Sequence, residues 1–271
     1  MPRRPRRATS QFVFHVINRA VEGVILFTGP DEYCCFLGIL AEGLRRFPVR
    51  LHAYALMPTH WHLVLWPCND ESLSALMKWV TATHAQAWRR MRGNVGRGAV
   101  YQGRYKAIAV QDDGHFLRMC HYVERNALRK YLVERAEQWP WSSAFPRATE
   151  ANRPALSSWP VPRPPTWLER LNESESVRRL NLVRTAVRAG RHFGTPGWRR
   201  CIASGLEWRQ PRQRPRRAPK EVTATRPVTP ERADRPESLS RPLAAGHQPS
   251  NSLQESEQSR PLQGNGWSRP P

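Results

Sequence analysis

The sequence has few cysteines and no long apolar run. These two features argue against a disulfide-rich protein and against a membrane protein. The cysteines are Cys34, Cys35, Cys68, Cys120 and Cys201. Their number is odd and they form no Cys-x-x-Cys pair, which argues against a zinc ribbon or a disulfide scaffold. No apolar stretch reaches the length of a membrane span, and the apolar segment behind the N-terminal arginines is too short for a secretion signal. We therefore expect a cytoplasmic protein with reduced thiols and no membrane partner.

The sequence is also poor in acidic residues. It has 22 Asp and Glu against 43 Lys and Arg, which gives a formal net charge of +21. This excess favours a polyanionic partner, and nucleic acid is the first candidate, ahead of an acidic membrane surface. Arginine outnumbers lysine, and its planar guanidinium suits phosphates and base edges. Arg3 and Arg4, in a basic N-terminal arm, are candidate DNA-binding residues.

Apolar residues are distributed unevenly, and this divides the chain into four parts. Dense apolar patterning over residues 11–148 predicts the main domain, which follows the basic arm at 1–10. Residues 149–208 begin as a proline-rich connector and continue as a small helical C-terminal extension. From 209 to 271 proline, arginine, serine and glutamine dominate, and this composition predicts a disordered tail.

The first part of the tail is strongly basic. Six Lys and Arg residues lie between Arg209 and Lys220, and they include Arg212 and Arg214. We predict that this run binds nucleic acid non-specifically, through phosphate contacts. The alternative is a solvated tail without a binding role.

The main domain carries the signals of four strands and three helices. Strands are predicted at residues 11–18, 51–57, 60–66 and 100–110. Helices are predicted between Pro30 and Phe47, from Ser72 to Trp88, and from Asp113 to Leu128. The order strand, helix, strand, strand, helix, strand predicts an α+β fold of the ferredoxin-like type, in which a βαββαβ antiparallel sheet has its helices on one face.

The most informative motif is His60-Trp61-His62, at the start of the third predicted strand. Side chains two apart on a strand point to the same face, so His60 and His62 project together while Trp61 packs into the core. Two adjacent imidazoles on a rigid strand form half of a site for a divalent metal. The alternative is a pair of polar residues on the solvent face of a half-buried sheet.

A third ligand is predicted on the last helix of the domain. Tyr122 and Asn126 are four residues apart and therefore share a helix face. The amide oxygen of Asn126 can complete the metal site begun by His60 and His62, with Tyr122 one turn away. Taken alone, a tyrosine on a helix is ordinarily a core or rim residue.

Five motifs follow one another in a recognisable order. They are residues 57–62 (MPTHWH), 101–106 (YQGRYK), 122–126 (YVERN), 139–143 (WPWSS) and 188–198 (RAGRHFGTPGW). Their order and spacing resemble the REP-associated tyrosine transposases, single-tyrosine members of the HUH nuclease superfamily. The resemblance covers about residues 8–208, and the motifs together are much more specific than any one of them. The family has a ferredoxin-like catalytic domain, in agreement with the element order.

The resemblance implies a metal-dependent endonuclease and strand transferase for single-stranded DNA, with Tyr122 as its nucleophile. Tyr122 would become joined to a 5′ phosphate and free a 3′ hydroxyl, because a phenol with a pKa of about 10 ionises far more easily than an alkyl alcohol. His60, His62 and Asn126 would hold Mg²⁺ or Mn²⁺ at the scissile phosphate. The implied substrates are palindromic repeat hairpins, and the family includes monomers and homodimers.

Two basic residues of the second motif are candidate phosphate contacts. Arg104 and Lys106 lie on the strand predicted beside the histidines, and ordinary surface charge is the alternative for both.

Two positions depart from the family's pattern. Ala127 follows Asn126 where the family usually has proline, and Thr59 stands where it commonly has asparagine. The loss of proline can alter the end of the tyrosine helix. Neither departure removes a predicted ligand or the nucleophile.

Three other functions remain as alternatives. A relaxase or rolling-circle initiator also combines these motifs, but commonly adds a third histidine close to the pair or a helicase domain, and the sequence shows neither. A catalytically inactive descendant would keep only nucleic-acid binding. A metal hydrolase unrelated to DNA leaves the positive charge and Tyr122 unexplained.

Overall fold

Four antiparallel strands form the centre of the computed structural model, which describes residues 10–96, 98–111, 113–146 and 153–204. The strands are β1 (Val13–Arg19), β2 (Val49–Met57), β3 (His60–Pro67) and β4 (Lys106–Val110), and their order in the sheet is β2-β3-β1-β4. Helix α1 (Pro30–Arg46) connects β1 to β2, and α2 (Ser72–Met91) connects β3 to β4. The predicted ferredoxin-like βαββαβ fold is confirmed.

Helices α1 and α2 pack closely against each other. Helix α1 has Pro30 in its first turn and arginines in its last, both of which suit those ends of a helix. At Gly43 a Cβ atom would come within 2.8 Å of Leu76 Cδ1 on α2. The missing side chain therefore lets the two helices approach, which places both over the same face of the sheet.

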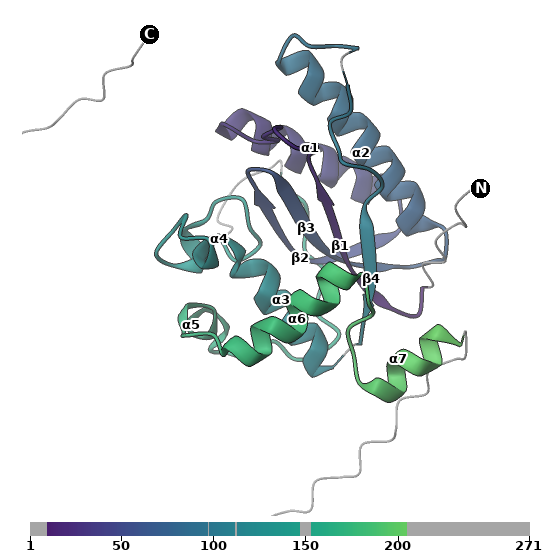
Figure 1. Cartoon of the computed structure of the whole chain (residues 1–271), viewed down its shortest axis with the longest axis vertical. Helices are drawn as coiled ribbons and strands as arrows, with labels where there is room; N and C mark the ends of the chain where they lie inside the picture. Colours follow the sequence, from purple (N-terminus) through teal and green to yellow (C-terminus); the bar gives the residue numbers. More distant parts are fainter. Residues whose placement is uncertain (1–9, 97, 112, 147–152, 205–271) are drawn as a thin grey trace, which may run out of the picture. The chain divides into compact units, whose positions relative to one another are not determined.

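The two faces of the sheet are covered by different helices. Leu63 and Leu65 of β3 belong to the core that also contains the buried residues of α1 and α2. Val64, between them, packs with residues of α3 (Gly114–Glu124) on the opposite face (Figure 1). The prediction of helices on one face thus holds for the two connecting helices, whereas α3 lies on the other face because that face is also apolar.

The remaining helices are short, apart from α6. They are α4 (Asn126–Arg129), the 3₁₀ helix η1 (Ala136–Gln138), α5 (Trp167–Asn172), α6 (Val177–Ala189) and α7 (Pro196–Ala203). Val183 and Val187 of α6 pack into the core beneath α3. Trp198 of α7 is buried in the other core, where its ring meets Phe12 edge-on at 5.7 Å. The extension therefore packs on both faces of the sheet.

Two of the motifs cover the edges of the sheet. At the β2 edge, Leu56 N donates to Trp141 O (2.9 Å) and Ser143 N donates to Tyr54 O (2.9 Å). At the β4 edge, Phe193 N donates to Ala109 O (2.8 Å). Exposed edges invite pairing with other chains, so these segments protect the sheet as well as extending it.

Two elements are shorter than predicted. Helix α3 ends at Glu124, because Arg125 leaves helical geometry (φ −83°, ψ 3°), and the continuous helix to Leu128 was therefore wrong. Ala127 is the second residue of the separate α4, where a proline would be tolerated, so the tyrosine helix ends without one. Strand β4 begins only at Lys106, and Tyr101 pairs with Ala20 through an isolated bridge.

Some predictions fall outside the residues that the structure describes. They concern Arg3, Arg4, Arg212 and Arg214 and the disordered tail. Within the described ranges, no helix combines the length and apolar character needed to cross a membrane.

The buried histidines predict a fold that acid destabilises. Burial lowers the pKa of His52 to about 4. In the unfolded chain this histidine binds a proton below about pH 6.5, whereas in the folded protein it binds one only below about pH 4. The free energy of unfolding should fall as the pH drops through this window, by about 1.4 kcal/mol per pH unit for each such histidine. Chemical denaturation at a series of pH values measures it.

His52→Phe should keep the packing against Phe116. It should lower the dependence of the unfolding free energy on pH by the equivalent of about one bound proton. A slope unchanged by this substitution would show that His52 is not neutral in the folded protein.

Candidate active site

One cavity brings together all six predicted site residues that the structure describes. It has a volume of about 1180 Å³ and receives side chains from β1, β3, α3, α4 and α6. The predicted residues that line it are His60, His62, Arg104, Lys106, Tyr122 and Asn126. Residues more than sixty positions apart in the sequence thus meet at one place.

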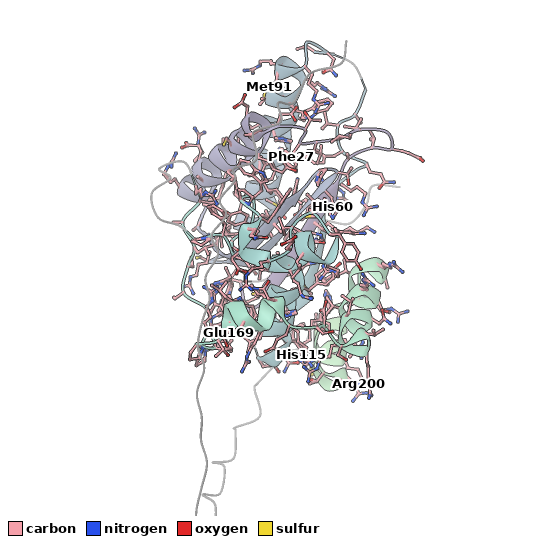
Figure 2. All side chains as sticks on the ribbon, turned by 90° about the vertical axis from the view of Figure 1, so that its left-hand side faces the viewer. Phe27, His60, Met91, His115, Glu169 and Arg200 are labelled. Atoms are coloured by element: carbon pink, nitrogen blue, oxygen red, sulfur yellow. The ribbon has the colours of Figure 1, made fainter. Side chains whose placement is uncertain are left out.

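The two histidines of the motif lie side by side on β3. Their ring centroids are 5.0 Å apart, and His62 is only 2% exposed. Trp61, between them, is buried in the core on the opposite face. Figure 2 shows His60 well separated from His115, which lies near the start of α3.

Each histidine of the pair has a contact at its Nδ1 atom. His62 Nδ1 lies 2.9 Å from His15 Nε2, and His60 Nδ1 lies 3.2 Å from Thr59 Oγ1. These contacts leave Nε2 of each ring as the nitrogen available to a metal. Thr59, which departs from the family's pattern, therefore still supplies a polar neighbour to His60.

His15 corrects the expectation that no third histidine is close to the pair. It lies on β1, where Ile17 is directly opposite His62, so His15 reaches His62 diagonally across the two strands. The two rings stack with centroids 5.1 Å apart. Alternation along β1 indicates that His15 and Ile17 share a face, but only the strand register shows that His62 lies against them.

All three imidazoles are held in the neutral form. Burial lowers the pKa of His15 to about 3 and, together with the charges of Arg19 and Lys130, that of His60 to about 4. Burial also keeps the pKa of His62 well below its ordinary value. Neutral imidazole is the form that binds metals, so the pair is ready to act as a ligand near neutral pH.

Asn126 fits the place of a third ligand. It is 3% exposed, and its amide nitrogen has no hydrogen-bond partner among the described residues. Its amide oxygen is a ligand type that Mg²⁺ and Mn²⁺ accept, and Asn126 lines the cavity together with the histidines. In the described ranges, no group of three or more His, Cys, Asp or Glu side chains could hold a metal. The site therefore offers two imidazoles and one amide, and the other positions would be open to phosphate oxygens and water.

Tyr122 lies between the histidines and a buried arginine. Its ring centroid is 5.8 Å from that of His62, with the planes perpendicular. Arg129 Cζ lies 4.3 Å from the Tyr122 ring centroid, and its Nη2 donates to the backbone oxygen of Tyr122 (2.9 Å). Arg129 was not predicted. Its cation lies over the face of the Tyr122 ring and so makes a cation–π contact with it.

Glu175, just before α6, holds Arg129 in place. It lies 3.6 Å from Arg129 Nη1, 3.6 Å from His121 Nδ1 and 4.0 Å from Arg125 Nη1. Burial raises the pKa of Glu175, but the hydrogen bond from His121 and the charges of both arginines bring it below its ordinary value. This carboxylate thus ties the C-terminal extension to the tyrosine helix.

A second buried carboxylate fixes the end of that helix. Glu124 accepts hydrogen bonds from Ser143 Oγ (2.6 Å) and Trp167 Nε1 (2.6 Å). Ser143 belongs to the WPWSS motif, which also pairs with the edge of β2. The motif therefore connects the position of Tyr122 to the sheet that carries the histidines.

The charge of the cavity is entirely of one sign. No acidic side chain of the described ranges lines it. The basic residues that line it are Arg19, Arg104, Lys106, Arg129, Lys130, Arg184 and Arg188. The sequence analysis identified only Arg104 and Lys106 among them. Arg184 and Arg188 come from α6, whose position no periodicity in the sequence indicates.

The other tyrosines near these strands are placed differently. Tyr101 is engaged by two partners, since its hydroxyl lies 2.7 Å from His84 Nδ1 and accepts from Trp61 Nε1 (3.1 Å). Burial raises its pKa. Tyr105 lines a separate, smaller cavity of about 690 Å³. Tyr122 is the tyrosine that shares a cavity with the histidine pair.

Comparison with protein families agrees with this arrangement. Residues 8–126 match the model of the family described as Transposase IS200 like. This part of the chain is therefore similar to the IS200-like transposases. The match ends at Asn126, so it spans His60, His62 and Tyr122 as well. The matched residues therefore include every predicted ligand and the predicted nucleophile.

Two further comparisons concern individual proteins. No curated protein matches the chain significantly. One solved structure that is similar to the chain is that of a REP-associated tyrosine transposase bound to a REP hairpin; it has 15% sequence identity and a TM-score of 0.44, and the match covers 58% of this chain and 99% of that chain.

The contacts of Glu175 predict that the C-terminal extension stabilises the main domain. Glu175→Gln keeps the shape of the side chain but removes the charge opposite Arg129, Arg125 and His121, so the free energy of unfolding should fall by about 1–3 kcal/mol. Glu173→Gln, at an exposed position two residues earlier, is the matched control and should change little. Equal stability of the two variants by chemical denaturation would contradict the role of Glu175.

Proposed function

We propose that this chain is a metal-dependent endonuclease and strand transferase that cuts single-stranded DNA through a 5′-phosphotyrosine intermediate. The observation that carries the proposal is that Tyr122, His60, His62 and Asn126 line one strongly basic cavity. A metal-ligating pair, a nucleophile and a surface for phosphates are the parts that phosphoryl transfer to a protein requires.

Tyr122 supplies the oxygen that attacks the scissile phosphate. A bond forms between its oxygen and phosphorus while the bond from phosphorus to the 3′ oxygen breaks; the phenolic proton passes to solvent, and the 3′ oxygen takes up a proton from water. The Arg129 guanidinium, which lies over the face of the Tyr122 ring, adds positive charge close to the place of this step. Because the phosphotyrosine keeps the bond energy, a 3′ hydroxyl can reverse the reaction and join strands without ATP.

His60, His62 and Asn126 would hold a divalent cation, Mg²⁺ or Mn²⁺, at the scissile phosphate. When bound, the cation polarises the phosphate and neutralises its developing charge. The two imidazoles are neutral and Asn126 is an uncharged amide, so these ligands leave the charge of the cation undiminished.

The basic residues around the cavity would hold the DNA strand. Arg104 and Lys106 line the same cavity as the histidines, although β1 separates β4 from β3, and Arg184 and Arg188 reach the cavity from α6. Phosphate contacts position a strand without reading its sequence. The resemblance to REP-associated tyrosine transposases makes palindromic repeat hairpins the proposed substrate, bound by a monomer or a homodimer.

One alternative is a catalytically inactive descendant that only binds nucleic acid. It would keep the basic cavity but would not need Tyr122 and Asn126 beside the histidines. Another is a relaxase or rolling-circle initiator with a third histidine ligand. His15 directs its Nε2 to His62 Nδ1, which does not favour its use as a ligand.

The nucleophile is tested by trapping the covalent intermediate. Incubation with labelled single-stranded palindromic DNA and Mn²⁺ should give a protein–DNA adduct that survives denaturant. Tyr122→Phe removes one oxygen while the ring still packs, so the fold should remain and the adduct should disappear. His60→Ala should also abolish the adduct, and a higher metal concentration should restore part of it.

Tyr105→Phe is the control for loss of a phenol nearby and should form the adduct normally. An adduct that persists in Tyr122→Phe would assign the nucleophile to another residue. A wild-type protein that binds the hairpin tightly and forms no adduct with any metal would favour the inactive descendant.

The arginines of α6 predict a change in the salt dependence of DNA binding. Replacing both Arg184 and Arg188 with glutamine should weaken binding to single-stranded DNA and reduce the slope of log K against log salt by about 0.7 for each lost phosphate contact. The control pair, Arg178→Gln with Arg179→Gln, lies on the same helix outside the cavity lining. If both pairs of substitutions reduce the slope equally, the cavity does not guide the strand.

A further inference from the structure

The contact between His15 and His62 is buried, and the proposed chemistry gives it no role. His15 Nε2 lies 2.9 Å from His62 Nδ1, and the residues are 1% and 2% exposed. The other nitrogen of His15, Nδ1, is buried and has no hydrogen-bond partner among the described residues. In the described part of the chain, the only hydrogen bond that the His15 side chain makes is therefore the one to His62.

A hydrogen bond between two neutral imidazoles uses one proton, and its position decides which nitrogen of His62 is free. If the proton is on His62 Nδ1, His15 Nε2 accepts it and His62 Nε2 keeps its lone pair. If the proton is on His15 Nε2, then His62 carries its own proton on Nε2 and cannot bind a metal there. A metal at the pair thus requires the first arrangement.

We propose that His15 is a positioning residue that holds His62 in the tautomer and ring orientation that a metal ligand needs. This inference rests on the proposed metal site at His60 and His62. Histidines that bind metals generally donate their second ring nitrogen to an acceptor, usually a carboxylate, carbonyl or water. Here a second imidazole from the neighbouring strand takes that place. Because it is neutral, it adds no negative charge to the site.

His60 has a weaker counterpart to this contact. Thr59 Oγ1 lies 3.2 Å from His60 Nδ1, and Thr59 is exposed, so water can replace it. No water can reach the contact between His15 and His62 in the same way, since both residues are buried. We therefore expect the loss of His15 to affect the metal more than the loss of the Thr59 hydroxyl.

The test measures metal binding without DNA. Mn²⁺ binding to the full chain is followed by electron paramagnetic resonance for the wild type, His15→Phe, His15→Gln and His52→Phe. His15→Phe fills the space without an acceptor and should weaken Mn²⁺ binding by about 10- to 100-fold. His15→Gln offers an amide oxygen near the position of Nε2 and should bind within a few-fold of the wild type. His52→Phe, the loss of a buried histidine outside the cavity lining, should bind as the wild type.

A spectroscopic measurement separates positioning from loss of structure. Nitrogen-15 chemical shifts of the His62 ring should report a proton on Nδ1 when Zn²⁺, a diamagnetic probe, is bound to the wild type and to His15→Gln. In His15→Phe, stable folding with a mixture of His62 tautomers is expected. Wild-type Mn²⁺ affinity in His15→Phe would overturn the proposal. So would His15→Gln binding as poorly as His62→Ala, because that result would make His15 a direct ligand.

His62→Ala distinguishes this inference from the function on which it rests. If His62→Ala binds Mn²⁺ like the wild type, the metal site itself is wrong. If His62→Ala loses the metal while His15→Phe retains it, only the role of His15 is wrong.

Discussion

The site depends on the alternation of side chains along β3, a central strand of the sheet. Trp61 faces the core beneath α1 and α2, so His60 and His62 must face the side on which α3 packs. Burying His62 and half-burying His60 there is costly for the fold, and it is tolerated because both imidazoles remain neutral and His62 is hydrogen-bonded to His15. The same burial that opposes protonation keeps the nitrogens free for a metal. The proposed metal site would account for this otherwise unfavourable arrangement of the core.

A second constraint is the position of the tyrosine helix, which the segments after it determine. Helix α3 ends at Glu124, and the carboxylate of that residue is bonded to Ser143 and Trp167. Glu175 holds Arg129 against the Tyr122 ring. The C-terminal extension therefore does more than protect the edge of β4. It supplies contacts that fix Tyr122 relative to the sheet, and α6 adds two arginines to the cavity.

The sequence was most informative where a pattern is local. Strand alternation placed His60 and His62 on one face, and a spacing of four residues placed Asn126 near Tyr122, although the helix is interrupted at Arg125. Local periodicity also predicted α1, α2 and the order of strands and helices along the chain. It could not give His15, because that contact depends on the register between β1 and β3.

Arg129 and Glu175 escaped prediction for a related reason. Each is an ordinary charged residue by its neighbours in sequence, and their pairing arises from the packing of α6 against α3. The same packing brings Arg184 and Arg188 to the cavity. Contacts of this kind are specified by tertiary structure, which a single sequence does not display.

The central claim is that Tyr122 is the residue that becomes covalently joined to DNA in this cavity. Peptide mapping of the protein–DNA adduct tests this claim most directly. Trypsin cuts after Arg118 and Arg125, so Tyr122 lies in the peptide Met119–Arg125, whereas Tyr101 and Tyr105 lie in two other peptides. After trapping with labelled DNA and nuclease trimming, mass spectrometry should find the 5′-phosphonucleotide on Met119–Arg125 alone. A nucleotide on the peptide of Tyr101 or Tyr105, or on any other, would contradict the account.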